Sequence, residues 1–295
     1  MYSRLARLKA KHTDDPVKSE PCIRRGVPRP IDVLILSVPI ASVLICALLV
    51  PVLALSQSPM AVLHTEGLVH GFLVLRTLEG NTIADGDVTQ VAKGDRVTNH
   101  LVFRFKDGSI YEETVVFSQR NRFRVASDHL LQKGPAFKHP MEVWLEVSTG
   151  QVTVRYTEDD GKEKTITDRL KLPSDVANGI TLTLLKNIRP GVMQTTLSLV
   201  AATPKPRIVK LVISPEGADS LSIGGSSHKV TRYLVKIQVG GVTGLVAPLV
   251  GKQPPDTHVW ILGGDAPVFV KLEGPLYQDG PTWRIELTSP VWRND

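Results

Sequence analysis

The side chains that could carry acid–base or nucleophilic chemistry are few, and their spacing argues against catalysis. Glu112 and Glu113 are adjacent, but neighbouring residues of a strand point to opposite faces of a sheet, so they cannot act together as acid and base. Ser226, Ser227 and His228 follow two glycines, but no Gly-x-Ser-x-Gly motif is present, and a catalytic triad is assembled in space. We interpret this second group as a polar turn and expect no catalytic residues.

Three aspartates have a spacing that resembles a calcium-binding loop: Asp85, Asp87 and Asp95. Such a loop needs a glycine at its tight turn and a glutamate at its last position. The sequence has Gln90 and Arg96 at these places. We therefore expect a solvated loop without calcium.

The sequence also predicts no phosphate or zinc site. Residues 244–252, GLVAPLVGK, have six residues between the two glycines where a phosphate-binding loop has four, and Gln253 follows where Ser or Thr would bind magnesium. We expect a strand–turn–strand there. The eight histidines are scattered, and no two are four residues apart, so zinc binding is not expected. We predict neither a cofactor nor a metal.

Two further groups of residues could form a ligand surface. Arg120, Arg122 and Arg124 alternate and would line one face of a strand; this face could bind an anion, but we favour a solvated sheet face. The tryptophans are expected to fill the core: Trp144, Trp260, Trp283 and Trp292. An enzyme would need distant polar groups to converge, such as His258 with Asp265.

The apolar run Val33 to Leu55 determines on which side of a membrane these residues lie. It holds 23 residues without a charged side chain, enough for a helix to cross a hydrocarbon layer of roughly 30 Å. Basic residues are concentrated before the run and the first one after it is Arg76. The positive-inside rule then places the N-terminus in the cytoplasm. We predict a transmembrane signal anchor over residues 31–56, with residues 57–295 exported.

Cleavage of this segment is the alternative. Ala54-Leu55-Ser56 offers small residues where signal peptidase prefers them, which would leave Gln57 as the new N-terminus. The apolar run is longer than an ordinary signal-peptide core, and we favour the retained anchor. Cys46 is preceded by Val43-Leu44-Ile45 without the small residue of a lipoprotein site, so lipidation is not expected.

Composition bounds the partners and the compartment. The chain has 35 Lys and Arg against 29 Asp and Glu, and most of the excess lies before the apolar run, so we expect no nucleic-acid partner. Membrane lipid around the predicted helix is the partner that the sequence implies. Both cysteines precede the exported part, and no Asn-x-Ser/Thr acceptor occurs. This fits a protein of the bacterial inner membrane with a periplasmic C-terminal domain.

The exported part is predicted to be mainly β. We expect a disordered basic tail over 1–30, a linker over 57–66, and a large curved antiparallel β-sheet domain over 67–295, because short apolar runs alternate with Gly, Asp and Pro turns. About ten to thirteen strands result. Residues Ala202–Pro206 could separate two lobes, but a loop within one sheet is preferred.

Two hairpins allow a register to be predicted. A two-residue turn at Thr149-Gly150 would pair Leu145 with Val154 and place Trp144 opposite Arg155, with a cation–π contact. In the second hairpin, a two-residue turn at Asp107-Gly108 competes with a three-residue turn that ends at Ser109. We favour the latter, because it pairs Phe105 with Tyr111 and Arg104 with Glu112; Glu113 alone does not fit this pattern.

The best helix candidate is Asp175 to Ile188. Ser174 can cap it, Asp175 suits its positive end, and Arg189-Pro190 ends it. Gly179 weakens the prediction. One helix among many strands favours a large curved sheet with the helix packed on one face.

These elements together resemble a known class of protein. The apolar anchor, the Asp107-Gly108-Ser109 hairpin and the segment LPSDVANGITLTLLKN (172–187) are similar to those of uncharacterised bacterial membrane-anchored envelope proteins, whose layout resembles the Lol-type curved-sheet periplasmic carriers. The resemblance implies a sheet wrapped around a helix with an apolar groove between them, and it carries no site residues. We therefore predict a non-enzymatic, single-pass envelope protein that binds an apolar ligand or partner. A structural or protein-interaction module is the first alternative, and an enzyme of unrecognised type is the second.

Overall fold

The computed structural model describes residues 58–158, 160–202, 205–223, 225–239 and 254–288. Every described residue belongs to one compact unit, which lies within Leu55–Asp295. The predicted basic tail and membrane-spanning helix lie outside the described residues. Within the described ranges, no helix has the length and apolar character to span a bilayer.

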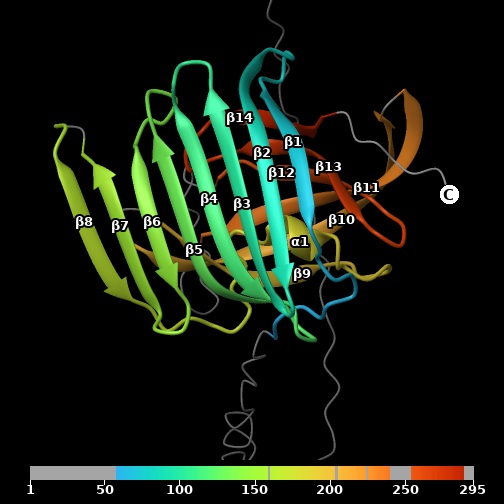
Figure 1. Cartoon of the computed structure of the whole chain (residues 1–295), viewed down its shortest axis with the longest axis horizontal. Helices are drawn as coiled ribbons and strands as arrows, with labels where there is room; N and C mark the ends of the chain where they lie inside the picture. Colours follow the sequence, from blue (N-terminus) through green and yellow to red (C-terminus); the bar gives the residue numbers. More distant parts are fainter. Residues whose placement is uncertain (1–57, 159, 203–204, 224, 240–253, 289–295) are drawn as a thin grey trace, which may run out of the picture. The chain divides into compact units, whose positions relative to one another are not determined.

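Fourteen strands form one antiparallel sheet (Figure 1). The prediction of a mainly antiparallel β-fold with one helix is confirmed, and the predicted range of about ten to thirteen strands falls short of the fourteen described. The strands are β1 Val69–Arg76, β2 Thr82–Lys93, β3 Arg96–Phe105, β4 Ile110–Ser118, β5 Arg124–Lys133, β6 Met141–Glu146, β7 Gln151–Thr157, β8 Glu163–Arg169, β9 Thr195–Ala201, β10 Arg207–Ile223, β11 Ser226–Gln238, β12 Thr257–Leu262, β13 Val268–Pro275 and β14 Thr282–Leu287, and the helix is α1 Thr181–Leu185.

The sheet consists of two meanders joined by its first and last strands. Strands β1 to β8 follow one another across one half, β9 to β14 follow one another across the other, and β1 pairs with β14 between them. This seam places Leu73 opposite Leu287 and Leu75 opposite Ile285. Strands β9 and β10, on either side of the segment considered as a lobe boundary, pair directly with each other.

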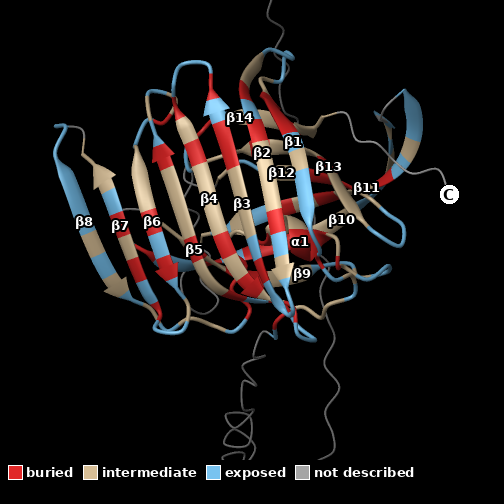
Figure 2. Cartoon of the chain, in the orientation of Figure 1, coloured by how far each residue is buried: buried red, intermediate tan, exposed pale blue. Residues whose placement is uncertain are grey.

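The two halves of the sheet curve around α1, as Figure 1 shows. One core cluster joins Val115 of β4 and Ile213 of β10 with Leu184 and Leu185 of α1. These residues come from distant strands of the sheet and are nearly inaccessible to solvent. Burial alternates along most strands of the first meander, whereas β8 at the sheet edge is largely exposed (Figure 2). The helix therefore fills part of the space that the curvature encloses.

The helix is much shorter than the predicted Asp175–Ile188. Val176 forms a parallel bridge with Ser198 of β9, and the amide of Ala177 donates to the carbonyl of Ser198 at 2.9 Å. Gly179 then turns the chain with φ +67°, and a Cβ there would lie 2.7 Å from the Cβ of Val115. Val176 and Ala177 are therefore held by the edge strand β9, and the chain turns at residues 178–180 before the helix begins at Thr181.

The register predicted for the β6–β7 hairpin is wrong by two residues. Leu145 pairs with Val152 and Val143 with Val154, because the amide of Val147 donates to Ala126 next to β5 and leaves the hairpin. A shift of two residues keeps every side chain on its predicted face. The predicted cation–π contact is confirmed, since the Arg155 guanidinium lies 5.5 Å from the centre of the Trp144 ring.

Both registers considered for the β3–β4 hairpin are also wrong. Phe103 pairs with Tyr111 and Arg104 with Ile110, and the amide of Phe105 donates to the carbonyl of Ser109 at 2.9 Å. The loop therefore ends at Gly108, whose φ is +86°. This left-handed position suits glycine, and it decides the register.

The segment before β1, for which a linker is expected, packs against the sheet and the helix. The amides of Leu63 and His64 both donate to Asn187 Oδ1 at 2.8 Å, and the amide of Phe123 donates to the carbonyl of Met60 at 2.9 Å. These bonds bring the chain along the C-terminal end of α1 before it enters β1.

Candidate functional site

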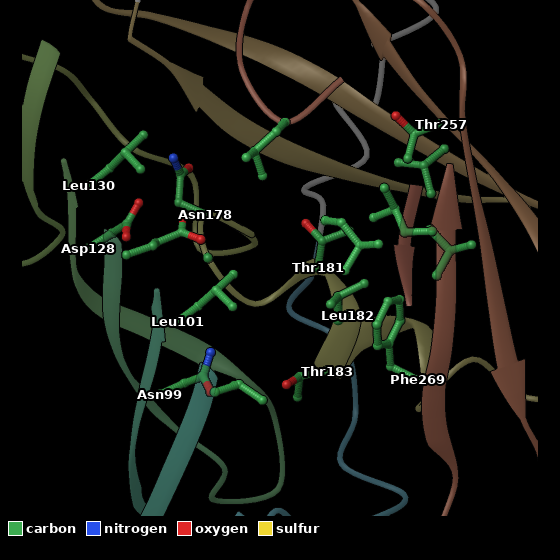
Figure 3. Close-up of a pocket in the computed structure, with 18 of the residues that line it drawn as sticks. Asn99, Leu101, Asp128, Leu130, Asn178, Thr181, Leu182, Thr183, Thr257 and Phe269 are labelled. Carbon is green, nitrogen blue, oxygen red and sulfur yellow. The ribbon is translucent and has the colours of Figure 1, made fainter. Parts of the chain in front are cut away.

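A cavity of about 1220 Å³ lies between the two halves of the sheet, next to α1 (Figure 3). This volume slightly exceeds the range of most small-molecule sites, roughly 300–1,000 Å³. Residues from β1 to β6 line it on one side, residues from β9 to β14 line it on the other, and α1 contributes Thr181, Leu182 and Thr183. A ligand there would contact both halves of the sheet.

The first wall follows from the alternation of side chains along neighbouring strands. In the register of β2 to β5, Leu101 lies opposite Val88 and Glu113, and Leu130 lies opposite Glu113. Every second residue therefore faces the cavity, and this wall mixes apolar with polar side chains. The inward residues of these strands include Val88, Gln90, Asn99, Leu101, Phe103, Tyr111, Glu113, Asp128, Leu130 and Gln132.

Gly86 on β2 allows a large ring to lie flat on this wall. A Cβ at Gly86 would clash with the ring of Phe103 on β3 and would lie 2.8 Å from the Cβ of Leu73 on β1. Gly86 pairs with both of these residues. The glycine therefore makes room for Phe103, which is fully buried.

The second wall and the helix are predominantly apolar. Phe269 of β13 and Leu182 of α1 project into the cavity from neighbouring positions in Figure 3. The other apolar side chains of this wall come from β9 to β14, and they are Leu199, Leu211, Val235, Ile237, Val259, Val268, Leu272, Ile285 and Leu287. Such a lining favours an apolar ligand, because its burial removes apolar surface from water.

One patch of the first wall is acidic. Glu113 of β4 and Asp128 of β5 lie on the same inward face, because Glu113 pairs with Leu130, two residues beyond Asp128. The Tyr111 hydroxyl donates to Glu113 Oε2 at 3.4 Å. Asp128 is 6% exposed, whereas Glu113 is half-buried, because part of its surface faces the cavity.

Burial perturbs the acidity of all three groups. Desolvation raises the pKa of Glu113 to about 7, against a smaller lowering by the Tyr111 hydrogen bond. Desolvation and then the Glu113 charge raise the pKa of Asp128 well above its usual range, while a hydrogen bond from Asn178 lowers it. Desolvation followed by both carboxylates also raises the pKa of Tyr111. The cavity therefore holds two neighbouring carboxyl groups whose pKa values are both raised by burial.

The hydrogen bonding of this pair is incomplete. Asp128 Oδ1 is buried and has no partner among the described residues. Asn178 fixes its own amide by accepting from the Val200 amide at 2.8 Å and donating to the Val200 carbonyl at 3.0 Å. A buried acceptor without a donor costs free energy unless a ligand or water supplies one.

A second polar group of the lining is fully paired. Lys186, just after α1, forms an ion pair with Glu66 at 2.6 Å, and Gln90 Nε2 donates to Glu66 Oε2 at 2.9 Å. Gln119 exchanges hydrogen bonds with the backbone of Glu66. This network ties the segment before β1 to the helix, and its groups are already satisfied.

Exposed apolar side chains surround one end of the cavity. Leu68 is 83% exposed and Phe72 is 58% exposed, and both contribute to the lining. They lie at the start of β1, where the pairing with β14 begins only at Leu73. An apolar ligand would meet these residues between solvent and the interior.

Most motifs singled out in the sequence lie away from the cavity. Asp85 and Asp87 are in strand β2 and not in the expected solvated loop, and Asp87 Oδ2 lies 2.9 Å from His70 Nε2. Asp95 pairs with Arg120 at 2.5 Å. Throughout the described part of the chain, no group of three or more His, Cys, Asp or Glu could hold a metal ion.

The arginines do not form the expected face of one strand. Arg120 and Arg122 lie in the connection between β4 and β5, where Asn121 has φ +58°, and only Arg124 begins a strand. Arg122 Nη1 donates to the carbonyl of Pro59 at 2.6 Å. The backbone leaves the extended conformation here, so the alternation is lost.

The serine–histidine group belongs to strand β11 and not to a polar turn. Ser226, Ser227 and His228 pair with the end of β10, and Ser227 Oγ lies 2.7 Å from Ser220 Oγ. His258 pairs with Glu216 at 2.9 Å and not with Asp265. The GLVAPLVGK segment lies outside the described residues.

The tryptophans divide between core and surface. Trp260 is buried, with its Nε1 donating to Asp219 Oδ2 at 2.8 Å, and Trp283 packs on Phe105, as predicted for core residues. Trp144 is instead exposed and stacks on His129 with 5.2 Å between ring centroids. Trp292 lies outside the described residues.

Sequence reasoning missed the Glu113–Asp128 pair. It considered Glu113 with its neighbour Glu112, which faces the other side and lies 2.8 Å from His100, and as the one residue that does not fit the favoured hairpin register. The available signal was that Glu113 interrupts an inward face made of Tyr111, Val115 and Phe117. Its partner Asp128 is 15 residues away and is brought close only by the β4–β5 register.

Comparison with known proteins gives little further information. No protein-family model and no curated protein matches the chain. Two solved structures are similar. A beta-barrel-like protein of the domain of unknown function DUF1849 from Brucella abortus shares 10% identity over 78% of this chain and 100% of that chain, with a TM-score of 0.44. The hypothetical lipoprotein YmcC from Escherichia coli shares 9% identity over 77% of this chain and 87% of that chain, with a TM-score of 0.33. Similarity at this level supports no functional argument.

Proposed function

We propose that the chain is a single-pass, membrane-anchored bacterial envelope protein whose periplasmic β domain binds an apolar ligand. The observation that carries this proposal is the cavity of about 1220 Å³ with predominantly apolar walls. An apolar molecule buried there would gain roughly 25 cal/mol for each Å² removed from water. The anchor and the compartment in this proposal rest on the apolar run and the basic tail of the sequence.

A cavity that already exists needs little rearrangement to accept a ligand. Its two walls are held by the continuous sheet and by α1, so the entropic cost of ordering the site is paid during folding. The exposed apolar residues Leu68 and Phe72 continue the lining toward solvent. These features favour a binding protein, because an open and largely apolar cavity is typical of a small-molecule site.

The alternative of an interaction module that pairs through a sheet edge has less support. The outer strand β8 is polar and exposed and carries both signs of charge: Glu163, Lys164, Asp168 and Arg169 (Figure 2). Charged side chains on an edge strand discourage pairing with another chain. Crosslinking of the full chain in a membrane would report such pairing directly.

The binding proposal is tested by filling the cavity. Leu101→Trp and Leu199→Trp place an indole into opposite walls, and Thr98→Trp adds the same group to the outer face of β3. The full chain, held in an amphipathic polymer, is titrated with 1-octanol by calorimetry, with the empty polymer as blank. We expect both wall variants to weaken binding by at least about fivefold and Thr98→Trp to change it by less than about twofold. Equal affinity for all four proteins, or no binding by the wild type, would refute the proposal.

A further inference from the structure

We infer that the apolar ligand carries a positively charged amine, and that Asp128 and Glu113 together bind this amine inside the cavity. The inference rests on the proposed function and specifies the chemical class of its ligand. It assigns Asp128 and Glu113 as binding residues, with Asn178 and Tyr111 holding them in place.

The first observation is an acceptor that the protein leaves unused. Asp128 lines the cavity, is 6% exposed, and its Oδ1 has no partner among the described residues. Figure 3 shows its side chain beside Asn178, with Leu130 and Leu101 nearby. An oxygen of this kind needs a donor, and the surrounding leucines offer none.

The second observation is the absence of a compensating cation near the pair. Four basic residues contribute to the described lining, and three of them bind elsewhere: Lys186 with Glu66, His70 with Asp87, and His64 with the carbonyl of Asp265. The fourth, Arg207, is exposed at the start of β10. None of these four raises or lowers the pKa of either carboxyl group.

The groups that face the pair from other elements are neutral. From β3 they are Asn99 and Leu101, from the segment before α1 Asn178, and from α1 Thr181 and Thr183. On β4 and β5 themselves, Tyr111 and Gln132 are uncharged at neutral pH. The remaining acidic residues of the described lining are Glu66, Asp265 and Asp279. A cation that reaches the pair would therefore meet two carboxyl groups that no basic side chain of the described lining neutralises.

An ammonium group fits this site better than a metal ion or a hydroxyl. A metal ion would need more ligands than the two carboxyl groups, and the described residues contain no cluster of three. A hydroxyl donates one hydrogen bond. An ammonium donates three, and its positive charge neutralises the negative charge of the carboxylates. The apolar walls then accommodate the rest of the molecule.

Binding of the amine would release protons from the carboxyl pair. The pKa of Glu113 is raised to about 7, so below that pH the group is mostly protonated. When the ammonium binds, the carboxyl O–H bond breaks, the proton passes to solvent, and the carboxylate pairs with the ammonium. Affinity for the amine should therefore rise as the pH increases through about 7, and it should fall again only where the amine itself deprotonates.

The test compares three chain-matched ligands on the full chain in the same polymer: octylamine, 1-octanol and octanoate. At pH 8 we expect octylamine to bind at least about tenfold more tightly than octanol, and octanoate to bind most weakly. Asp128→Asn should weaken octylamine at least about tenfold and octanol less than about twofold. Glu112→Gln, on the outer face of the same strand as Glu113, should change neither.

The outcomes separate this inference from the proposed function. If octanol binds and octylamine binds no tighter, or if Asp128→Asn retains octylamine affinity, the inference is overturned and the binding proposal stands. If none of the three ligands binds, both fail. Should Asp128→Asn not fold, Glu113→Gln provides the same comparison. Calorimetry at pH 6.5 in buffers of different ionisation enthalpy should show proton release with octylamine and none with octanol.

Discussion

At the scale of single residues, the cavity differs from an ordinary core by its carboxyl pair. Glu113 and Asp128 face inward among apolar side chains, and burial raises the pKa of both. Burying these two carboxyl groups costs folding free energy, and an apolar residue in either place would make the fold more stable. This cost is the reason to assign them a role in binding. Tyr111 and Asn178 reduce this loss without removing it.

Glu113 should make the protein less stable as the pH rises. Its ordinary pKa of 4.5 is raised to about 7 in the folded chain. Between these values the native state holds a proton that the unfolded state has lost, so the free energy of unfolding falls with increasing pH and levels off above about 7. Between pH 5.5 and 8 this loss should be roughly 2 kcal/mol.

The measurement is denaturant unfolding of the full chain at both pH values. Glu113→Gln should remove the share of the difference that Glu113 contributes, because glutamine does not titrate, and the raised pKa of Asp128 should leave a remainder. Glu112→Gln is the matched control: it changes the neighbouring residue on the outer face and should keep the wild-type difference. A Glu113→Gln variant that retains the full pH dependence would show that Glu113 is not the responsible group.

At the scale of elements, the turn before α1 decides where the helix packs. Gly179 has φ +67° and touches Val115 of β4, a fully buried residue of the main core cluster. This close approach brings Asn178 next to Asp128 and directs Thr181 and Leu182 into the cavity. One glycine therefore fixes the distance between the helix and the first wall.

Gly179→Ala should destabilise the protein by about 2–4 kcal/mol. The new Cβ would lie 2.7 Å from the Cβ of Val115 and would also adopt an unfavourable backbone conformation. Gly191→Ala separates the two effects, because Gly191 has φ +84° with nothing within 4 Å of an added Cβ. It should cost only about 1 kcal/mol. Thermal unfolding measures both variants, and equal losses would show that contact with Val115 is unimportant.

At the scale of the whole described unit, two meanders enclose the cavity because their first and last strands pair. The β1–β14 seam joins residues more than 200 positions apart, such as Val74 and Glu286, and Arg76 adds an ion pair to Glu286 at 3.2 Å. Both walls therefore belong to one continuous sheet. A ligand that touches both walls should stabilise them together.

Hydrogen exchange should reveal this joint stabilisation. With 1-octanol at ten times its dissociation constant, opening of the walls should slow about tenfold, since ligand binding stabilises only the closed state. Amides of β4 and β5 in one half and of β12 and β13 in the other should gain protection, whereas β8, which contributes no lining residue, should not. At the same octanol concentration, Leu101→Trp should reduce the slowing to about threefold or less. Protection confined to one half of the sheet would contradict a site between the walls.

The sequence pattern determined the faces of the strands better than their partners. In both hairpins the predicted register was wrong by an even number of residues, so Leu145, Tyr111 and Phe103 still face inward. Alternation is a local property with period two, whereas the exact register depends on bonds outside the hairpin, such as that from Val147 to Ala126. For the same reason the helix was predicted too long: the bonds of Ala177 to β9 are not visible in its own segment.

The sequence by itself determined that this chain has a mainly antiparallel β-fold with one helix and no recognisable catalytic motif, because strand alternation, turn residues and motif spacing are read within short segments. Only the tertiary structure decided that the sheet encloses a cavity and that Glu113 meets Asp128 there. Curvature of the sheet and the pairing of β1 with β14 depend on contacts between residues far apart in the chain. A site formed by such contacts has no local pattern from which it could be predicted.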